Sequence, residues 1–189
     1  MVMTHEPYHR TLKGFIPVMK TLIFAGSIRQ AAYSRKLAQE AAHLARLQGA
    51  QVTLLELSSL DIPMYNADLE AQGTPDAVLH LKEIMDAHAA WIIVTPEYNG
   101  SYPALLKNTL DWASSPVKEH PIWSCGDKPF AGKVVGLLSA SPGGMGGMRA
   151  ISHLQPLLLG LGCWLAPHHY SLPFAGTAFD EKHHLKEAS

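Results

Sequence analysis

Apolar residues along the chain alternate between short continuous runs and longer stretches with helical spacing, from residue 20 onward. The short runs cover residues 21–25, 52–57, 91–95, 134–140 and 163–166, and each is almost continuously apolar. Strands that are covered on both faces have this composition, because neither row of side chains meets water. The pattern therefore predicts five parallel strands.

The stretch between the first two runs has apolar residues three and four positions apart, which is the spacing of one helix face. Gly49 is expected to end this helix. The expected buried face consists of Leu37, Ala38, Ala41, Leu44 and Ala45, and the expected exposed face of Arg35, Gln39, Glu40, His43 and Arg46.

Three more helices are predicted between the later strands. The first begins with Thr74 as N-cap and Pro75 as its first helical residue. The others cover about 103–112 and 147–159, and Pro156 should kink or restart the last of them. Strands alternating with helices predict right-handed crossovers and a doubly wound sheet, which binds ligands at the carboxyl ends of its strands.

The loop after the first strand, residues 26–35, opens directly into the first helix. Free backbone N–H groups and the positive end of the helix dipole favour an anion there, and Ser27, Ser34 and Arg29 add hydroxyl donors and charge. The loop lacks the Gly-Lys-Ser/Thr ending of a triphosphate loop and the GxGxxG of a dinucleotide fold. A single phosphate fits it better, and an ordinary capped helix with a surface arginine is the alternative.

Two further loops follow strands three and four. Residues 95–112 read TPEYNGSYPALLKNTLDW, and residues 139–149 read SASPGGMGGMR. The first string, together with Gly-Ser-Ile-Arg at 26–29, is similar to the signature of the NADPH-dependent FMN reductases, a family that includes quinone, chromate and azo reductases. The resemblance extends over about residues 20–180. Two separated motifs in the right order, each after a strand, make it specific.

The resemblance implies an α/β flavodoxin-like fold, with a doubly wound five-stranded parallel sheet of order 2-1-3-4-5 and helices on both faces. It implies FMN as cofactor and NADPH as co-substrate, with hydride passing through the flavin to a small acceptor such as a quinone, an azo compound, a metal oxyanion or free flavin. No catalytic side chain is expected, since the flavin carries the hydride. The implied phosphate ligands are Ser27, Arg29 and Ser34, and the implied ring contacts are Pro96, Glu97, Tyr98, Asn99 and Gly100 on one side and Ser141, Gly143 and Gly144 on the other.

Two other functions remain open. One is a flavodoxin-like electron carrier that binds FMN and does not use NADPH, although carriers usually need a strongly acidic docking face and the formal charge here is −1. The other is an interaction protein that keeps the fold without the flavin. Ala32 favours it, because relatives often carry Ser and Asn in this loop where the present chain has Ala32 and Ser34. One phosphate donor is therefore missing.

Family members end in a further amphipathic helix, whereas this chain stops at Ser189 after a polar stretch, residues 180–184. One sheet face is therefore expected to be thinly covered. An oligomer contact or the N-terminal tail would cover it, or the sequence is a truncated product. The resemblance also implies a homodimer or homotetramer, with the helix that ends at Trp112 as the candidate contact surface.

Composition narrows the partners to small molecules. The charge of −1 favours neither nucleic acid nor an anionic membrane, and no apolar run is long enough to span a bilayer. Two cysteines without a CxxC pair indicate a reducing cytoplasm. The paired histidines at 168–169 and 183–184 lack metal-ligand spacing, so no metal is expected. We expect one domain, residues 20–189, preceded by a flexible tail, residues 1–19.

Overall fold

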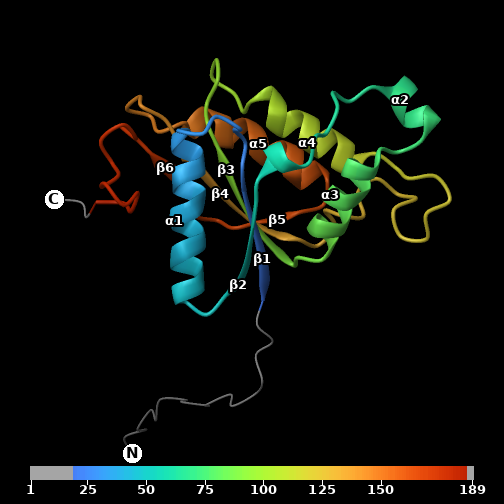
Figure 1. Ribbon diagram of the computed structural model, residues 1–189, viewed down its shortest axis with the longest axis horizontal. Helices are drawn as coiled ribbons and strands as arrows, with labels where there is room; N and C mark the ends of the chain where they lie inside the picture. The colour runs from blue at the N-terminus through green and yellow to red at the C-terminus, as the bar shows by residue number, and fades with distance from the viewer. Residues whose placement is uncertain (1–18, 187–189) are drawn as a thin grey trace, which may run out of the picture.

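The structure is a computed structural model that describes residues 19–186. It contains one six-stranded sheet in which every pairing is parallel, in the order β2-β1-β3-β4-β5, with β6 paired to β4 beyond the end of β5 (Figure 1). The predicted strand order is confirmed. The predicted flexible tail, apart from Met19, lies outside the described residues. The strands are β1 (Lys20–Ala25), β2 (Gln51–Leu55), β3 (Ala90–Thr95), β4 (Val134–Ala140), β5 (Trp164–Leu165) and β6 (Tyr170–Leu172).

The number of strands was predicted wrongly, as five. The missed strand, β6, has no continuous apolar run, because Tyr170 is 46% exposed and Ser171 is polar. Two predicted runs were also too long: the fifth, 163–166, contains only the two-residue strand β5, and the second, 52–57, extends past the end of β2. The second strand ends at Leu55, and Leu57 begins the short 3-10 helix η1 (Leu57–Ser59).

Helices cover both faces of the sheet, as predicted (Figure 1). On one face α1 packs over β1, β3 and β4. On the other face α3, α4 and α5 form the larger core with the opposite side chains of the same strands. The helices are α1 (Tyr33–Leu47), α2 (Ala67–Gln72), α3 (Asp76–Asp86), α4 (Ala104–Ser114) and α5 (Met148–Gly160).

Two prolines have a different place in their helices from the predicted one. Helix α3 begins at Asp76 with Pro75 as its cap, so Thr74 is not the N-cap. Helix α5 runs through Pro156 without restarting. A proline inside a helix costs about 3 kcal/mol. The fully buried Leu154 and Leu158 on either side of it indicate that core packing offsets this cost.

Two residues of α1 lie in the opposite environment to the predicted one. Glu40 is only 8% exposed and Leu44 is 48% exposed. Glu40 is covered because its Oε2 contacts His184 Nδ1 at 2.8 Å, in the segment that follows β6. Sequence spacing could not show this contact, because the two residues are 144 positions apart.

The helix predicted as the contact surface, α4, stays a prediction, but Trp112 itself does not contribute to such a surface. Its side chain is fully buried within this chain, where its indole N–H donates to the Pro63 carbonyl at 2.8 Å and its ring meets Tyr65 edge-on. Trp112 therefore belongs to the core of the subunit and is not available to a partner.

Candidate functional site

The β1–α1 loop leaves donors free at the start of α1. The cap residue, Ala32, makes no side-chain hydrogen bond to the helix, and the N–H groups of Tyr33 and Ser34 have no partner inside the helix because they belong to its first turn. Gly26 fixes the loop to the sheet by donating to the Val94 carbonyl at 2.9 Å. Helix α1 thus has no side-chain N-cap, and the choice between a phosphate site and an ordinary helix start with a surface arginine stays a prediction.

Ser34 carries an unusual hydroxyl. Its side chain is 1% exposed, yet its Oγ has no hydrogen-bond partner among residues 19–186. A buried polar group without a partner costs about 1–3 kcal/mol, so such groups usually have a reason to persist. Arg35 Nε and Trp123 Nε1 are also buried and unpartnered in the described chain. Of these three residues, Ser34 alone lines the cavity described next.

A cavity of about 300 Å³ lies at the carboxyl ends of β1, β3 and β4, and it brings residues of all three predicted loops together. Arg29 and Tyr98 also line an adjoining cavity of about 230 Å³ that extends toward α4. The residues lining the first cavity are Ser27, Arg29, Ala32, Tyr33, Ser34, Pro96, Glu97, Tyr98, Ala140, Ser141 and Pro142.

Four of the predicted residues do not line this cavity: Asn99, Gly100, Gly143 and Gly144. The structure does not test whether they contact a ligand, so their roles stay predictions. A larger cavity, of about 360 Å³, lies beside α2 and contains none of the predicted residues. We assign the site to the smaller cavity because the unpaired hydroxyl and the strand ends converge there.

The loop after β3 forms a tight two-residue hairpin at Asn99 and Gly100. Both have left-handed backbones, with φ of 52° and 79°, and Tyr98 and Ser101 exchange backbone hydrogen bonds of 2.9 and 3.1 Å. Asn-Gly is the preferred sequence for this turn because both residues tolerate positive φ. Tyr98 is 53% exposed, so its ring stands at the rim of the cavity.

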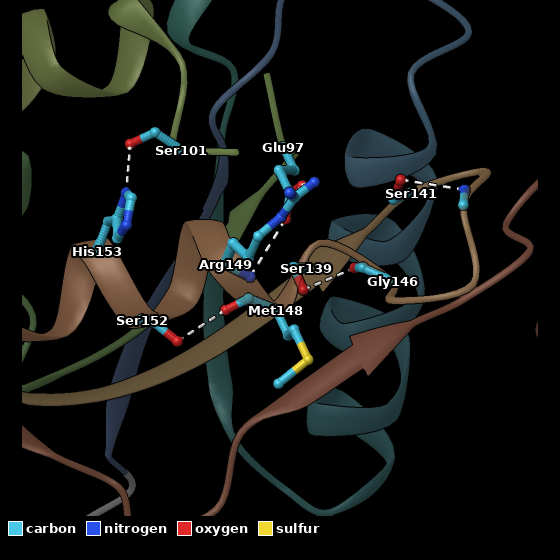
Figure 2. Close-up of polar contacts among 10 residues, drawn as sticks. Glu97, Ser101, Ser139, Ser141, Gly146, Met148, Arg149, Ser152 and His153 are labelled. Atoms are coloured by element: carbon cyan, nitrogen blue, oxygen red, sulfur yellow. Dashed lines mark hydrogen bonds and ion pairs between the residues drawn. The ribbon is translucent and has the colours of Figure 1, made fainter. Parts of the chain in front are cut away.

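The glycine-rich loop after β4 rests on β6. Ser139 Oγ donates to the Gly146 carbonyl at 2.8 Å (Figure 2). It also contacts Ser171 Oγ at 3.0 Å. Gly146 has φ of 62°, and a Cβ there would come within 2.7 Å of the Ser171 backbone. The loop can therefore approach β6 only with glycine at this position. Nearer the cavity, the Gly143 N–H donates to Ser141 Oγ at 3.2 Å.

Glu97 ties the second loop to the third. Its carboxylate accepts from Arg149 Nε at 2.8 Å and from the Arg149 backbone N–H at 3.2 Å, at the start of α5 (Figure 2). The Glu97 side chain is 9% exposed, whereas that of Arg149 is 58% exposed. One helical turn further on, His153 Nδ1 contacts Ser101 Oγ at 3.1 Å. Sequence reasoning missed Arg149, Ser101 and His153 as site residues. The available signal in the sequence was the four-residue spacing of Arg149 and His153, which places both residues on the same face of a helix.

Residues 19–186 show neither a metal cluster nor a membrane-spanning helix. They contain no group of three or more His, Cys, Asp and Glu side chains arranged to hold a metal ion. No helix in this range has the length and apolar character needed to cross a membrane.

Comparisons with known proteins point to one family. The family model of the NADPH-dependent FMN reductases matches residues 19–177. An NAD(P)H-dependent FMN reductase of Pseudomonas aeruginosa is 38% identical over 141 residues, which are 75% of this chain and 70% of that protein. A quinone reductase of Pseudomonas putida is 32% identical over 172 residues, or 90% of this chain and 86% of that protein.

Solved structures agree with these sequence relatives. The flavoenzyme FerB of Paracoccus denitrificans, an NAD(P)H:(acceptor) oxidoreductase, superposes with a TM-score of 0.75 at 30% identity and covers 89% of this chain and 86% of its own. A flavodoxin of Pseudomonas aeruginosa has a TM-score of 0.50 at 19% identity, covers 84% of this chain and 87% of its own, and supports the flavodoxin-like fold alone.

Proposed function

Because this chain belongs to the NADPH-dependent FMN reductase family, we propose that it binds FMN in the three-loop cavity and passes electrons from NADPH to a small acceptor, with a quinone as the first candidate. The chain is an oxidoreductase of this family, and its dependence on FMN and NAD(P)H follows from the family. The acceptor and the preference for NADPH over NADH belong to the proposal.

The observation that carries the proposal is the unpartnered Ser34 hydroxyl. A phosphate monoester supplies the acceptor that this buried donor lacks, and it would lie at the amino end of α1, where the helix dipole favours negative charge. Ser27 and Arg29 line the same cavity and add a hydroxyl and a positive charge. The residues present therefore fit a single phosphate, although Ala32 contributes no side-chain donor.

The two later loops supply the walls for a planar ring. In this proposal, backbone amides of the hairpin at Asn99 and Gly100 would contact one side of the ring, and the glycine backbone of the loop from Ser141 to Gly144 would contact the other. The contact between Glu97 and Arg149 joins the segment before the hairpin to the first turn of α5, which directly follows the glycine-rich loop. We therefore assign Glu97 a positioning role through Arg149 as well as its predicted ring contact.

FMN, when bound, supplies the redox chemistry: NADPH and a proton reduce a quinone to the hydroquinone and leave NADP⁺, with the flavin carrying the two electrons. The protein binds and orients the reactants and needs no acid–base pair of its own for this exchange. Arg29 and Tyr98 line both the FMN cavity of about 300 Å³ and the adjoining cavity of about 230 Å³. We place the approach of the second reactant in the adjoining cavity.

Anaerobic absorbance spectroscopy tests this function. We expect purified protein loaded with FMN to lose its yellow colour on addition of NADPH alone, and to regain it when a quinone is added. Protein that binds FMN but keeps its colour with NADPH would be an electron carrier, and protein that takes up no FMN would be an interaction protein. Turnover with quinones, azo dyes, chromate and free FMN then ranks the acceptors.

A homodimer or homotetramer in the cytoplasm is part of the same proposal. The chain has two free cysteines, Cys125 and Cys163, which fits a reducing compartment. Light scattering at micromolar concentration is expected to give two or four times the chain mass of 20.6 kDa. A mass of one chain would contradict the oligomer without affecting the assignment of FMN.

A further inference from the structure

One part of the sheet face that carries α1 is left open at the start of the strands. The register places Thr21, Ala90, Val134 and Trp164 in one row across β1, β3, β4 and β5. Side chains along a strand alternate between faces, so Val134 and Leu138 point to the same side as Ala140, which belongs to the core beneath α1. Trp164 pairs with Val134 and therefore shares this face.

The open face is strongly apolar and poorly covered by the described residues. Trp164 is 71% exposed and Val134 is 47% exposed; Tyr170, which pairs with Leu138 further along the same side, is 46% exposed. Strands of a doubly wound sheet normally have helices over both faces, because parallel sheets bury both rows of side chains. An exposed tryptophan beside an exposed valine on such a sheet therefore marks a surface that something else covers.

Helix α1 shows the same exposure along its flank. It runs antiparallel to the strands, so its last turns lie near the start of β2, over the rows at the amino-terminal ends of the strands. Leu37, in the first half of α1, is 3% exposed, whereas Leu44, on the same apolar stripe two turns later, is 48% exposed. The core beneath α1 thus covers Thr21 and Val52 but stops short of Val134 and Trp164 in the same row. We call Leu44, Val134, Trp164 and Tyr170 the open face.

We propose that residues 12–18 of this same chain cover the open face, with Phe15 and Ile16 packed on Trp164 and Val134. The segment has the chemistry for it, since Leu12, Phe15 and Ile16 are apolar. The segment also joins the sheet close to the open face, because β1 starts at Lys20, one position before the row that contains Trp164. The inference concerns a surface away from the FMN cavity and does not depend on the proposed function.

The distances allow this placement. Three strand spacings of about 4.8 Å separate β1 from β5, or about 14 Å along the row. Phe15 precedes Lys20 by five residues, and five extended residues reach about 17 Å. Phe15 and Ile16 are therefore close to the first residues that can reach Trp164, and Leu12 can extend beyond it. A tethered segment also has an effective concentration in the millimolar range, which a second copy lacks at micromolar protein.

Tryptophan fluorescence reports on this contact selectively. Trp91, Trp112 and Trp123 are at most 5% exposed, so acrylamide should quench Trp164 almost alone wherever Trp164 is free. In the full chain we expect weak quenching. The double variant Phe15→Ser/Ile16→Ser should show several-fold stronger quenching, and the difference should vanish when Trp164→Phe is added to both proteins. His9→Ser/Arg10→Ser is the control and should behave as wild type. All proteins are compared at the same flavin content.

Each other outcome contradicts the proposal. Equal quenching in wild type and in Phe15→Ser/Ile16→Ser means that the segment does not cover Trp164. Quenching that weakens as wild-type protein is raised from nanomolar to tens of micromolar assigns the face to a second copy. Strong quenching of wild type at every concentration leaves the face open in the free protein. Circular dichroism confirms that each variant is folded.

Limited proteolysis tests the contact from the side of the sheet. Trypsin should cut after Lys13 about tenfold faster in Trp164→Ser than in wild type, because cleavage follows the population of the undocked segment. Leu159→Ser is the matched control, since it also removes an exposed apolar side chain, 57% exposed, but from α5 on the opposite face. Equal cleavage in wild type and Trp164→Ser would overturn the proposal.

Discussion

Replacing Ser34 by alanine should have opposite effects on the empty and on the FMN-bound protein. In the empty protein the hydroxyl is buried without a partner, so it contributes a desolvation penalty and no hydrogen bond. Alanine removes this penalty, and it also has the higher helix propensity at a position inside α1. We therefore expect the free energy of unfolding of the empty protein to stay constant or to rise by about 1 kcal/mol.

The FMN-bound protein should respond in the other direction. A hydrogen bond to a charged group contributes about 1.5–3 kcal/mol, and Ser34→Ala removes one such bond to the phosphate. The dissociation constant for FMN should therefore rise between about tenfold and 150-fold, since each 1.4 kcal/mol is a factor of ten. Riboflavin lacks the phosphate, so its affinity should not change.

Two measurements on the same samples test this. Urea unfolding of the empty protein gives the stability difference, and titration monitored by flavin fluorescence gives both dissociation constants. Ser59→Ala is the control, because its hydroxyl is exposed, bonds to the Glu56 carbonyl at 2.8 Å and does not line the cavity. An FMN affinity of Ser34→Ala within about a factor of two of wild type, with loss of stability in the empty protein, would refute the reasoning.

Three further predictions concern titration, thiol reactivity and helix capping. Burial lowers the pKa of Lys82 from its ordinary value of 10.5 to about 8, so the unfolded chain binds this proton more tightly between these pH values. The free energy of unfolding should therefore rise with pH across this window, by at most about 3 kcal/mol, and Lys82→Met should lack this rise in urea titrations at pH 7.5 to 10.5. Burial raises the pKa of the Cys163 thiol to about 12, whereas Cys125 is exposed, so Ellman's reagent should label one thiol in the folded protein and two in denaturant; two fast thiols in the folded protein would contradict this. Glu97→Gln should lower the stability of the empty protein by about 1 kcal/mol in urea unfolding, because the carboxylate caps the positive end of α5, while an unchanged midpoint would mean that the cap contributes nothing.

Sequence reasoning predicted most of the fold because strands covered on both faces have a clear signature. The runs that became β1, β3 and β4 are long and apolar, and their order along the chain determined the topology. Strand β6 carried no such signature, since only Leu172 of its three residues is buried. It forms because β4 offers it a free edge beyond β5, which is a tertiary property.

The candidate site was predicted as a set of loops but not as a set of contacts. Strand ends placed Ser27, Glu97 and Ser141 together, because parallel strands end at one edge of the sheet. The pairing of Glu97 with Arg149 joins residues 52 positions apart and depends on where α5 begins after a glycine loop. Local spacing does not encode that geometry. The missing partner of Ser34 likewise becomes visible only once burial is known.

A crystal structure of the protein grown with excess FMN tests the assignment of the site most directly. We expect the phosphate within hydrogen-bond distance of Ser34 Oγ and beside Arg29, and the ring between the turn at Asn99 and the loop at Gly143. A flavin bound with its phosphate elsewhere, or clear density for the protein with no flavin in this cavity, would contradict the assignment.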